Sequence, residues 1–291
     1  MKYRLTSITL IVIALSLNSC KQKEKISDMN IIYLHHSTGA AIWEGRKPSI
    51  ITRAARKISP EMADIVGQKA ILPKLFQNYN RENDKNDHIN IKEMAFPKDS
   101  PYGWYNFPYD YYNIWVKNAG NQSYMGEPTL EILTKEYQVI IFKHCYPVSH
   151  IQVDQDSADI NSKYQSLANY KLQYEALRNK IHEFPKTKFI LFTGAALVRS
   201  AASEDEAKRA REFFTWVKDV WDQPGDNIYI WDLYNLETEG GVYFKDEYAV
   251  SPNDSHPNGE FAGKAAHLLF NRIIDVIEKN GTGTKPTGEK V

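Results

Sequence analysis

The sequence predicts an α/β domain, a three-layer sandwich around a mainly parallel, five-stranded sheet in flavodoxin-like order. Four short apolar runs, at 30–34, 138–142, 188–192 and 227–231, are typical of strands buried on both faces. Helical patterns lie between and after them, and this alternation favours a parallel sheet covered by helices. The run "INIKEMAF" at 89–96 is expected to supply the fifth strand.

Three segments repeat apolar residues at spacings of three and four, which predicts helices over 167–181, 207–221 and 262–276. Ser203 and Glu206 precede the second segment with the spacing of a capping box. The stretch 97–127 breaks the pattern, because it gathers tyrosine, tryptophan and proline in one long loop-like segment. Two interpretations of it remain open: a structural cover over the sheet edge, or an aromatic wall of a binding cleft.

The first residues have the shape of a secretory signal. Lys2 and Arg4 precede a short apolar run that ends in "LNSC". This ending resembles the lipobox of bacterial lipoproteins, which implies that Cys20 carries a lipid anchor. The alternatives are a plain signal peptide and an uncleaved anchor. We therefore expect an exported bacterial lipoprotein, attached to a membrane of the cell envelope on its periplasmic or outer-membrane face.

This interpretation divides the chain into a signal peptide (1–19), a tether (20–29), one domain (30–280) and a disordered polar tail (281–291). Loss of 1–19 takes Lys2 and Arg4 from a chain with 36 basic and 36 acidic residues and leaves a net charge of −2. With no basic face evident, the composition argues against a nucleic-acid partner. Besides Cys20 only Cys145 remains, so the core must hold the domain together without an internal disulfide.

Polar residues follow the predicted strands. "HHSTG" comes after the first strand and "KHCYP" after 138–142, while "NDSHPNG" precedes the last helix. The carboxyl ends of parallel strands share one edge, where ligands bind near the reversal of strand order. His256 could act there as a base, with Asp254 fixing its tautomer. Ser37 would be the nucleophile that such a base activates.

These segments resemble the SGNH (GDSL-like) hydrolases over most of the mature chain. "HHSTG" stands at the place of that family's Gly-Asp-Ser turn, and "DSHPNG" at the place of its Asp-x-x-His block. The resemblance implies that Ser37 is the nucleophile and His256 the base, oriented by Asp254 or, on strict spacing, by Asn253.

The resemblance also has departures. Two histidines replace Gly-Asp before the serine, and at most one of His35 and His36 should face the crevice. The family's oxyanion glycine corresponds to Gly120, and its asparagine has no counterpart. Lys143, His144 or Cys145 would have to replace that asparagine, although a thiol would stabilise an oxyanion poorly. His36 is a further candidate for oxyanion or substrate binding.

We expect ester hydrolysis through an acyl-enzyme, without a cofactor, on a small-molecule or glycan ester. An acylated carbohydrate is inferred from the predicted location and the resemblance. Three alternative interpretations remain open. Ser37 could merely cap the next helix. A metal could gather His36, His144, Asp254 and His256, although no local ligand pair supports it. The protein could also be a catalytically altered surface lipoprotein that binds glycans through 97–127.

Overall fold

The computed structural model describes residues 28–45, 70–83, 88–102 and 106–291. The predicted signal peptide, Cys20 and most of the tether lie outside the described residues, so their roles stay predictions. No helix among the residues that the structure describes is both long and apolar enough to span a bilayer.

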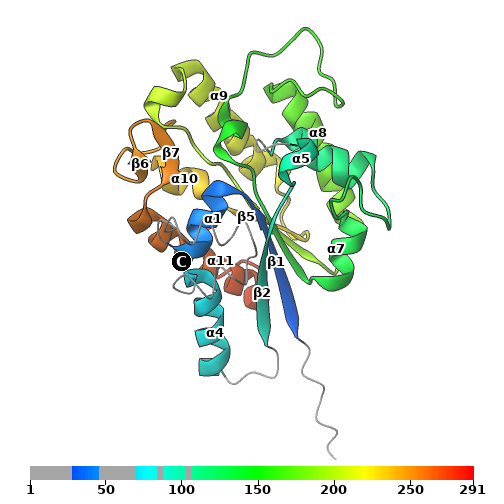
Figure 1. Ribbon diagram of the computed structural model, residues 1–291, viewed down its shortest axis with the longest axis vertical. Coiled ribbons are helices and arrows are strands. Elements are labelled where there is room, and N and C mark those ends of the chain that lie inside the picture. Colours follow the sequence, from blue (N-terminus) through cyan, green and yellow to red (C-terminus); the bar gives the residue numbers. More distant parts are fainter. Residues whose placement is uncertain (1–27, 46–69, 84–87, 103–105) are drawn as a thin grey trace, which may run out of the picture.

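The centre of the domain is a parallel sheet of five strands in the order β2-β1-β3-β4-β5 (Figure 1). This is the flavodoxin-like order that the sequence predicts. The strands are β1 (Met29–His35), β2 (Ile89–Ala95), β3 (Val139–Phe142), β4 (Lys188–Phe192) and β5 (Ile228–Trp231). Burial alternates along the edge strand β2 but is continuous in β3, as expected for a strand covered on both faces.

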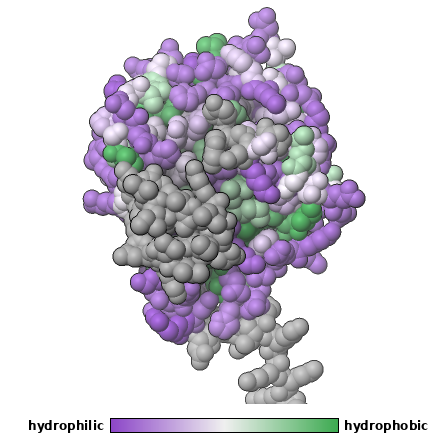
Figure 2. Space-filling view, in the orientation of Figure 1, coloured by the Kyte–Doolittle hydropathy of each residue, from purple (hydrophilic) through white to green (hydrophobic). Residues whose placement is uncertain are grey.

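Helices cover both faces of the sheet and make the three layers. α1 (Ser37–Glu44), α4 (Ile71–Asn83) and α11 (Gly259–Lys279) contact one another on one face. α6 (Pro108–Tyr111), the π-helix η1 (Tyr112–Lys117), α8 (Leu167–His182) and α9 (Glu204–Trp216) gather on the other face. Figure 2 shows hydrophilic residues over most of the face seen there, with hydrophobic residues in small areas only.

The remaining elements are short connections: α5 (Asp99–Tyr102), α7 (Leu130–Glu136), α10 (Leu233–Thr238), the strands β6 (Ala249–Ser251) and β7 (Asp254–Pro257), the 3-10 turns η2 (Tyr146–Ser149) and η3 (Arg199–Ala201), and the π-turn η4 (Val217–Trp221). The predicted helix over 207–221 is thus α9 followed by η4. The capping box of Ser203 and Glu206 is present at its start.

The segment 97–127 is not one loop, as the pattern predicts, but contains α5, α6 and η1. Pro108 stands at the first position of α6, which continues directly into η1. Tyr111 and Trp115 are fully buried and pack on Phe96 and Phe142, so part of the segment is core. Four other aromatic residues of the segment, Tyr102, Phe107, Tyr109 and Tyr124, line a surface pocket, so the segment divides into a core part and a pocket-lining part.

The C-terminal segment 281–291 is ordered, which corrects the prediction of a disordered tail. The Trp231 indole N–H donates to the Thr287 carbonyl (3.1 Å), and the Asp232 N–H donates to the Pro286 carbonyl (2.9 Å). Asp275 accepts the Thr284 N–H at 2.9 Å, and Thr284 and Thr287 are buried. The tail is polar in composition, but its backbone carbonyls and N–H groups complete hydrogen bonds that the domain needs.

Candidate active site

Ser37 is the first residue of α1, directly after β1. His36 is the N-cap, with an extended backbone and no side-chain cap hydrogen bond. Ser37 therefore does not cap the helix, which corrects that alternative. Its hydroxyl stands where the chain turns from strand into helix, at the carboxyl edge of the sheet.

The first turn of α1 also provides hydrogen-bond donors. The first intrahelical bond runs from the Ala40 N–H to the His36 carbonyl (2.9 Å). The N–H groups of Ser37, Thr38 and Gly39 consequently have no acceptor within the helix. Together with the positive end of the helix dipole they favour a negative oxygen beside Ser37.

Asp254 and His256 form a pair on the hairpin β6–β7. Asp254 Oδ1 lies 2.6 Å from His256 Nδ1 and also accepts the His256 backbone N–H at 3.0 Å. Ser255 points the other way, is buried, and accepts the Val198 N–H at 3.1 Å, which ties the hairpin to the loop after β4. The structure thus pairs His256 Nδ1 with Asp254, and Nε2 makes no hydrogen bond to the residues that the structure describes.

The Ser37 turn and the His256 pair meet around Cys145 and Tyr146. Ser37 Oγ lies 3.8 Å from Cys145 Sγ, and the His256 ring packs edge-on against the Tyr146 ring with centroids 5.1 Å apart. Because Cys145 and Tyr146 are adjacent in the chain and α1 contacts β7, the nucleophile and base candidates lie in the same region, although Ser37 and His256 do not hydrogen-bond to each other. Four elements, β1, α1, β3 and β7, converge there.

The two histidines before Ser37 anchor its turn to the chain around β2. The His35 Nε2 lies 2.8 Å from Glu93 Oε2, and the His35 ring lies against Tyr33 with centroids 4.5 Å apart. His36 Nε2 hydrogen-bonds the Pro97 carbonyl, and burial lowers the pKa of His36 to about 4. Both imidazoles are engaged with the protein, which gives a physical account of why histidines stand here.

Lys143 lies directly beneath the site. It is fully buried, and its Nζ is 3.6 Å from Cys145 Sγ. Burial lowers the pKa of Lys143, while Cys145 and Glu237 oppose that shift. Glu237 of α10 is also fully buried, and burial raises its pKa to about 8. The buried amine of Lys143 and the buried carboxyl group of Glu237 thus influence each other electrostatically, without forming an ion pair.

His144 and Gly120 are not brought to Ser37. His144 is fully buried, its Nδ1 is 2.7 Å from the Asn106 carbonyl and its Nε2 is 2.5 Å from the Tyr174 hydroxyl. The Gly120 carbonyl accepts the Thr129 hydroxyl at 2.5 Å, at the start of α7. Contacts of this kind place His144 in the core and Gly120 in a surface loop.

No three or more His, Cys, Asp and Glu side chains within 28–45, 70–83, 88–102 and 106–291 group in a way that could hold a metal ion. The residues proposed for the metal alternative do not lie together. His144 uses both ring nitrogens in the core, whereas His256 pairs with Asp254 on the hairpin.

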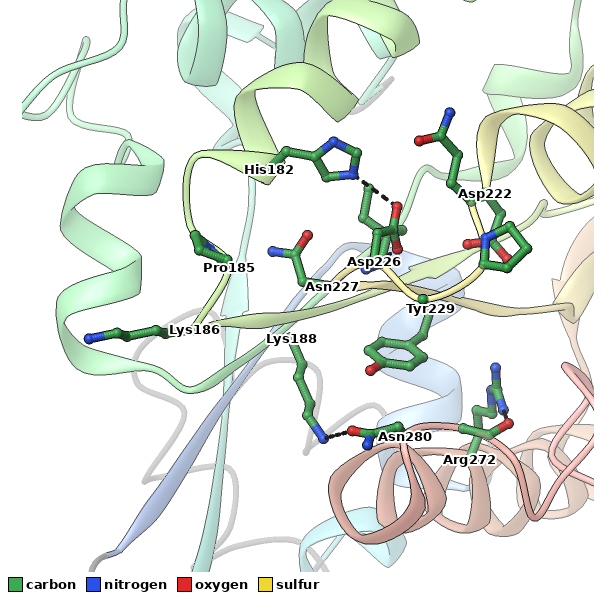
Figure 3. A pocket seen from close by; sticks show the side chains of 15 residues that line it. His182, Pro185, Lys186, Lys188, Asp222, Asp226, Asn227, Tyr229, Arg272 and Asn280 are labelled. Carbon is green, nitrogen blue, oxygen red and sulfur yellow. Dashed lines mark hydrogen bonds and ion pairs between the residues drawn. The ribbon is translucent and has the colours of Figure 1, made fainter.

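A pocket of about 700 Å³ lies away from these residues, at the amino ends of β4 and β5. Figure 3 shows His182 pointing to Asp226 and Lys188 to Asn280, at 2.9 Å in each case. Lys188 also donates to the carbonyls of Val276 and Ile277 at the end of α11. These polar groups mainly join α8, β5 and the end of α11, so pocket size alone does not locate the chemistry.

Several residues of this region are not predicted by the sequence reasoning. Tyr146 lies within the "KHCYP" segment, but no motif singles it out as a site residue. Glu93 and Pro97 belong to β2 and its exit, and their link to the histidines depends on strand pairing. Glu237 lies in α10, and no pattern in the chain connects it with Lys143.

Compared with known protein families, the chain matches no family model, and it has no significant match among curated proteins. One similar solved structure is that of a carbohydrate esterase whose active site is described as displaying divergent catalytic and non-catalytic binding functions. The identity is 12%, the alignment covers 89% of this chain and 70% of that chain, and the TM-score is 0.38. A similarity of this size carries no argument about activity, so the geometry of the chain itself must support the function.

Proposed function

We propose that the protein is a serine ester hydrolase that works through an acyl-enzyme. The observation that carries this proposal is the convergence of Ser37 and the Asp254–His256 pair on Cys145 and Tyr146. A hydroxyl, an imidazole and a carboxylate are the three groups that serine-based acyl transfer needs. The resemblance of "HHSTG" and "DSHPNG" to the SGNH hydrolases assigns them the same roles.

In the proposed reaction, Ser37 Oγ attacks the ester carbonyl carbon while His256 Nε2 accepts the hydroxyl proton. Asp254 accepts the Nδ1–H hydrogen bond and stabilises the imidazolium that forms. The tetrahedral oxyanion lies at the first turn of α1, where the Ser37 N–H and its neighbours donate. Collapse breaks the bond to the leaving alcohol, which takes the proton from His256. Water then hydrolyses the acyl-enzyme by the same steps.

Lys143 does not reach Ser37 directly in this arrangement, because Cys145 Sγ lies between them. Its contribution to the oxyanion would be the field of a buried cation and not a hydrogen bond. For the substrate we propose a small or carbohydrate ester, on an exported lipoprotein anchored through Cys20. These two points rest on the N-terminal sequence and the family resemblance.

The test is hydrolysis of 4-nitrophenyl acetate and of acetylated xylo-oligosaccharides by the purified protein. Ser37→Ala and His256→Gln should each lower kcat/KM by at least about 10³-fold, because each removes a reacting group. Ser203→Ala is the matched control, since it removes the N-cap of α9 at a cost of about 1 kcal/mol but leaves the site untouched. Undiminished turnover by Ser37→Ala would exclude the serine mechanism.

A further inference from the structure

A pocket of about 400 Å³ opens in the aromatic segment, apart from the Ser37 site. Four aromatic side chains line it (Tyr102, Phe107, Tyr109 and Tyr124), together with Asp110 and Asn113. They come from α5, α6, η1 and the turn before α7. While Tyr111 and Trp115 enter the core, their neighbours in the same segment line this pocket.

One wall is a tight turn over residues 124–127. The Tyr124 N–H donates to the Glu127 carbonyl at 3.0 Å, and the Glu127 N–H donates back at 2.9 Å. Met125 has a φ of 51°, in the left-handed region that costs a non-glycine residue on the order of 1–3 kcal/mol, and its surface is 60% exposed. Glu127 is fully buried and accepts the Lys98 N–H at 2.7 Å. The turn is thus anchored from below and holds a large apolar side chain at the pocket rim.

Another wall is the π-helix η1, which contributes Asn113. π-helical turns are rare and occur frequently at functional sites, because they displace side chains from the ordinary helical face. Here Asn113 also accepts the Asn118 side-chain N–H through its own Oδ1 at 3.1 Å, which fixes the amide beside the pocket.

Two polar groups of the lining bear on the ligand, and one of them lacks a hydrogen-bond partner among the described residues. The Tyr102 hydroxyl is buried and has no partner within the part of the chain that the structure describes. Asp110 is 7% exposed and accepts the Phe107 N–H at 2.9 Å, and burial raises the pKa of its carboxyl to about 7. A buried hydroxyl is normally hydrogen-bonded, so a ligand that bonds the Tyr102 hydroxyl is the economical explanation.

The charges around the pocket decide the class of ligand. Lys163 Nζ already lies over the Tyr109 ring at 5.6 Å, so that aromatic face holds a cation of the chain itself. An anion would meet the Asp110 carboxyl group. A neutral polyhydroxyl ligand suits both the aromatic and the polar part of the lining. Its C–H faces stack on the tyrosine rings, and its hydroxyls both donate and accept hydrogen bonds.

We propose that this pocket binds one sugar unit of a neutral oligosaccharide. This proposal rests on the residues that line the pocket and does not depend on hydrolysis at Ser37. If the proposed function also holds, the pocket would supply the carbohydrate recognition of that enzyme.

The experiment is calorimetric titration of the full chain carrying Ser37→Ala, so that no ester chemistry contributes. The probes are xylohexaose, mannohexaose, cellohexaose and chitohexaose, with tetramethylammonium as a cationic probe. We expect at least one hexasaccharide to bind with a Kd in the millimolar range or below. Tyr109→Ala should weaken that binding about tenfold or more, since it removes a stacking face.

Tyr243→Ala is the matched control, because Tyr243 stacks with Arg199 elsewhere and lies outside the pocket lining. Asp110→Asn tests the polar contact while the amide oxygen can still accept the Phe107 N–H. Thermal unfolding checks that each variant is folded. The proposal is overturned if none of the four hexasaccharides binds, if their binding is unchanged in both Tyr109→Ala and Asp110→Asn, or if tetramethylammonium alone binds in a Tyr109-dependent way.

Discussion

Asp254 and His256 are two positions apart on β7, and residues at this spacing project from the same face of a strand. Their side chains therefore meet, with Asp254 Oδ1 at 2.6 Å from His256 Nδ1. Asn253 lies outside the strand, before its first residue. Strand geometry thus explains how an Asp-x-His spacing can replace Asp-x-x-His without loss of the pair.

Asp254→Asn should lower kcat for ester hydrolysis by about 10²–10⁴-fold, because a carboxamide does not stabilise the imidazolium or enforce the tautomer. KM should change little. The measurement is steady-state kinetics with 4-nitrophenyl acetate, with Asn253→Ala as the control variant. Equal effects of the two substitutions would contradict the assignment of Asp254.

A substitution of Lys143 is expected to affect the stability of the fold and the rate of hydrolysis differently. Lys143→Met replaces a fully buried amine, which hydrogen-bonds the weak acceptor Cys145 Sγ, with an apolar side chain of similar length, so the free energy of unfolding should stay equal or rise. The rate of hydrolysis should nevertheless fall, because the positive field beneath the oxyanion is lost. Urea unfolding and kcat measured on the same preparation test this. A variant that is destabilised and equally active would give Lys143 a purely structural role.

The raised pKa of Glu237 leads us to expect that the free energy of unfolding depends on pH. Its pKa is about 8 in the folded protein against an ordinary value of 4.5. The stability that comes with the protonated form is fully present below about pH 4.5 and is lost as the pH rises through about 8. Glu237→Gln cannot ionise, and its amide oxygen can still accept the Ala196 N–H, which Glu237 accepts at 2.6 Å.

The variant should therefore gain stability relative to the wild type as the pH rises from 5 to 8. Urea unfolding at both values measures the difference. If the free energy of unfolding of the variant minus that of the wild type stays constant or falls between pH 5 and pH 8, the buried carboxyl group ionises without cost and this explanation is wrong.

At the scale of elements, Gly39 sets how closely α1 approaches β1. A Cβ at this position would lie 2.4 Å from His35 Cβ and 2.9 Å from Lys143 Cδ. The Tyr33 hydroxyl also donates to the Gly39 carbonyl at 3.1 Å. The helix that carries Ser37 is thus seated on the strand because this residue has no side chain.

Gly39→Ala should destabilise the fold by on the order of 1–3 kcal/mol, although helix propensity alone would favour alanine by about 1 kcal/mol. Activity should fall as well, since the Ser37 turn must move. Ala40→Gly in the same helix is the comparison, with a cost of about 1 kcal/mol from propensity alone. A Gly39→Ala variant more stable than wild type would refute the close packing.

Element prediction worked where a local pattern decides the structure. The apolar runs became β1, β3, β4 and β5, and the capping box of Ser203 begins α9. The pattern failed in 97–127, where three short helices depend on tertiary packing of Tyr111 and Trp115 against Phe96 and Phe142. Such contacts join distant parts of the chain and leave no periodicity to detect.

The same limit applies to the site. Ser37, His256 and Asp254 could be named as candidates because each stands in a short motif with a chemical meaning. The surroundings of the "HHSTG" motif could not be predicted, because the pairing of His35 with Glu93 depends on the register of β1 and β2. His144 shows the reverse error: its place after β3 is right, but its side chain turns into the core.

For the whole molecule, the tail is part of the fold. Removal of residues 282–291 would leave the N–H groups of Trp231 and Asp232 without their acceptors, at about 1–3 kcal/mol each. We expect the truncated chain to have a melting temperature several degrees lower. Calorimetry of the two chains measures this, and identical melting curves would restore the expectation of a disordered tail.

The central claim is that Ser37 is a nucleophile activated by His256. The most direct measurement is reaction with a fluorophosphonate ester, followed by intact-mass analysis and peptide mapping. A single phosphonyl adduct on Ser37, absent from Ser37→Ala and formed much more slowly in His256→Gln, is the predicted result. Labelling of another residue, or no adduct in a protein that hydrolyses esters, would contradict the account.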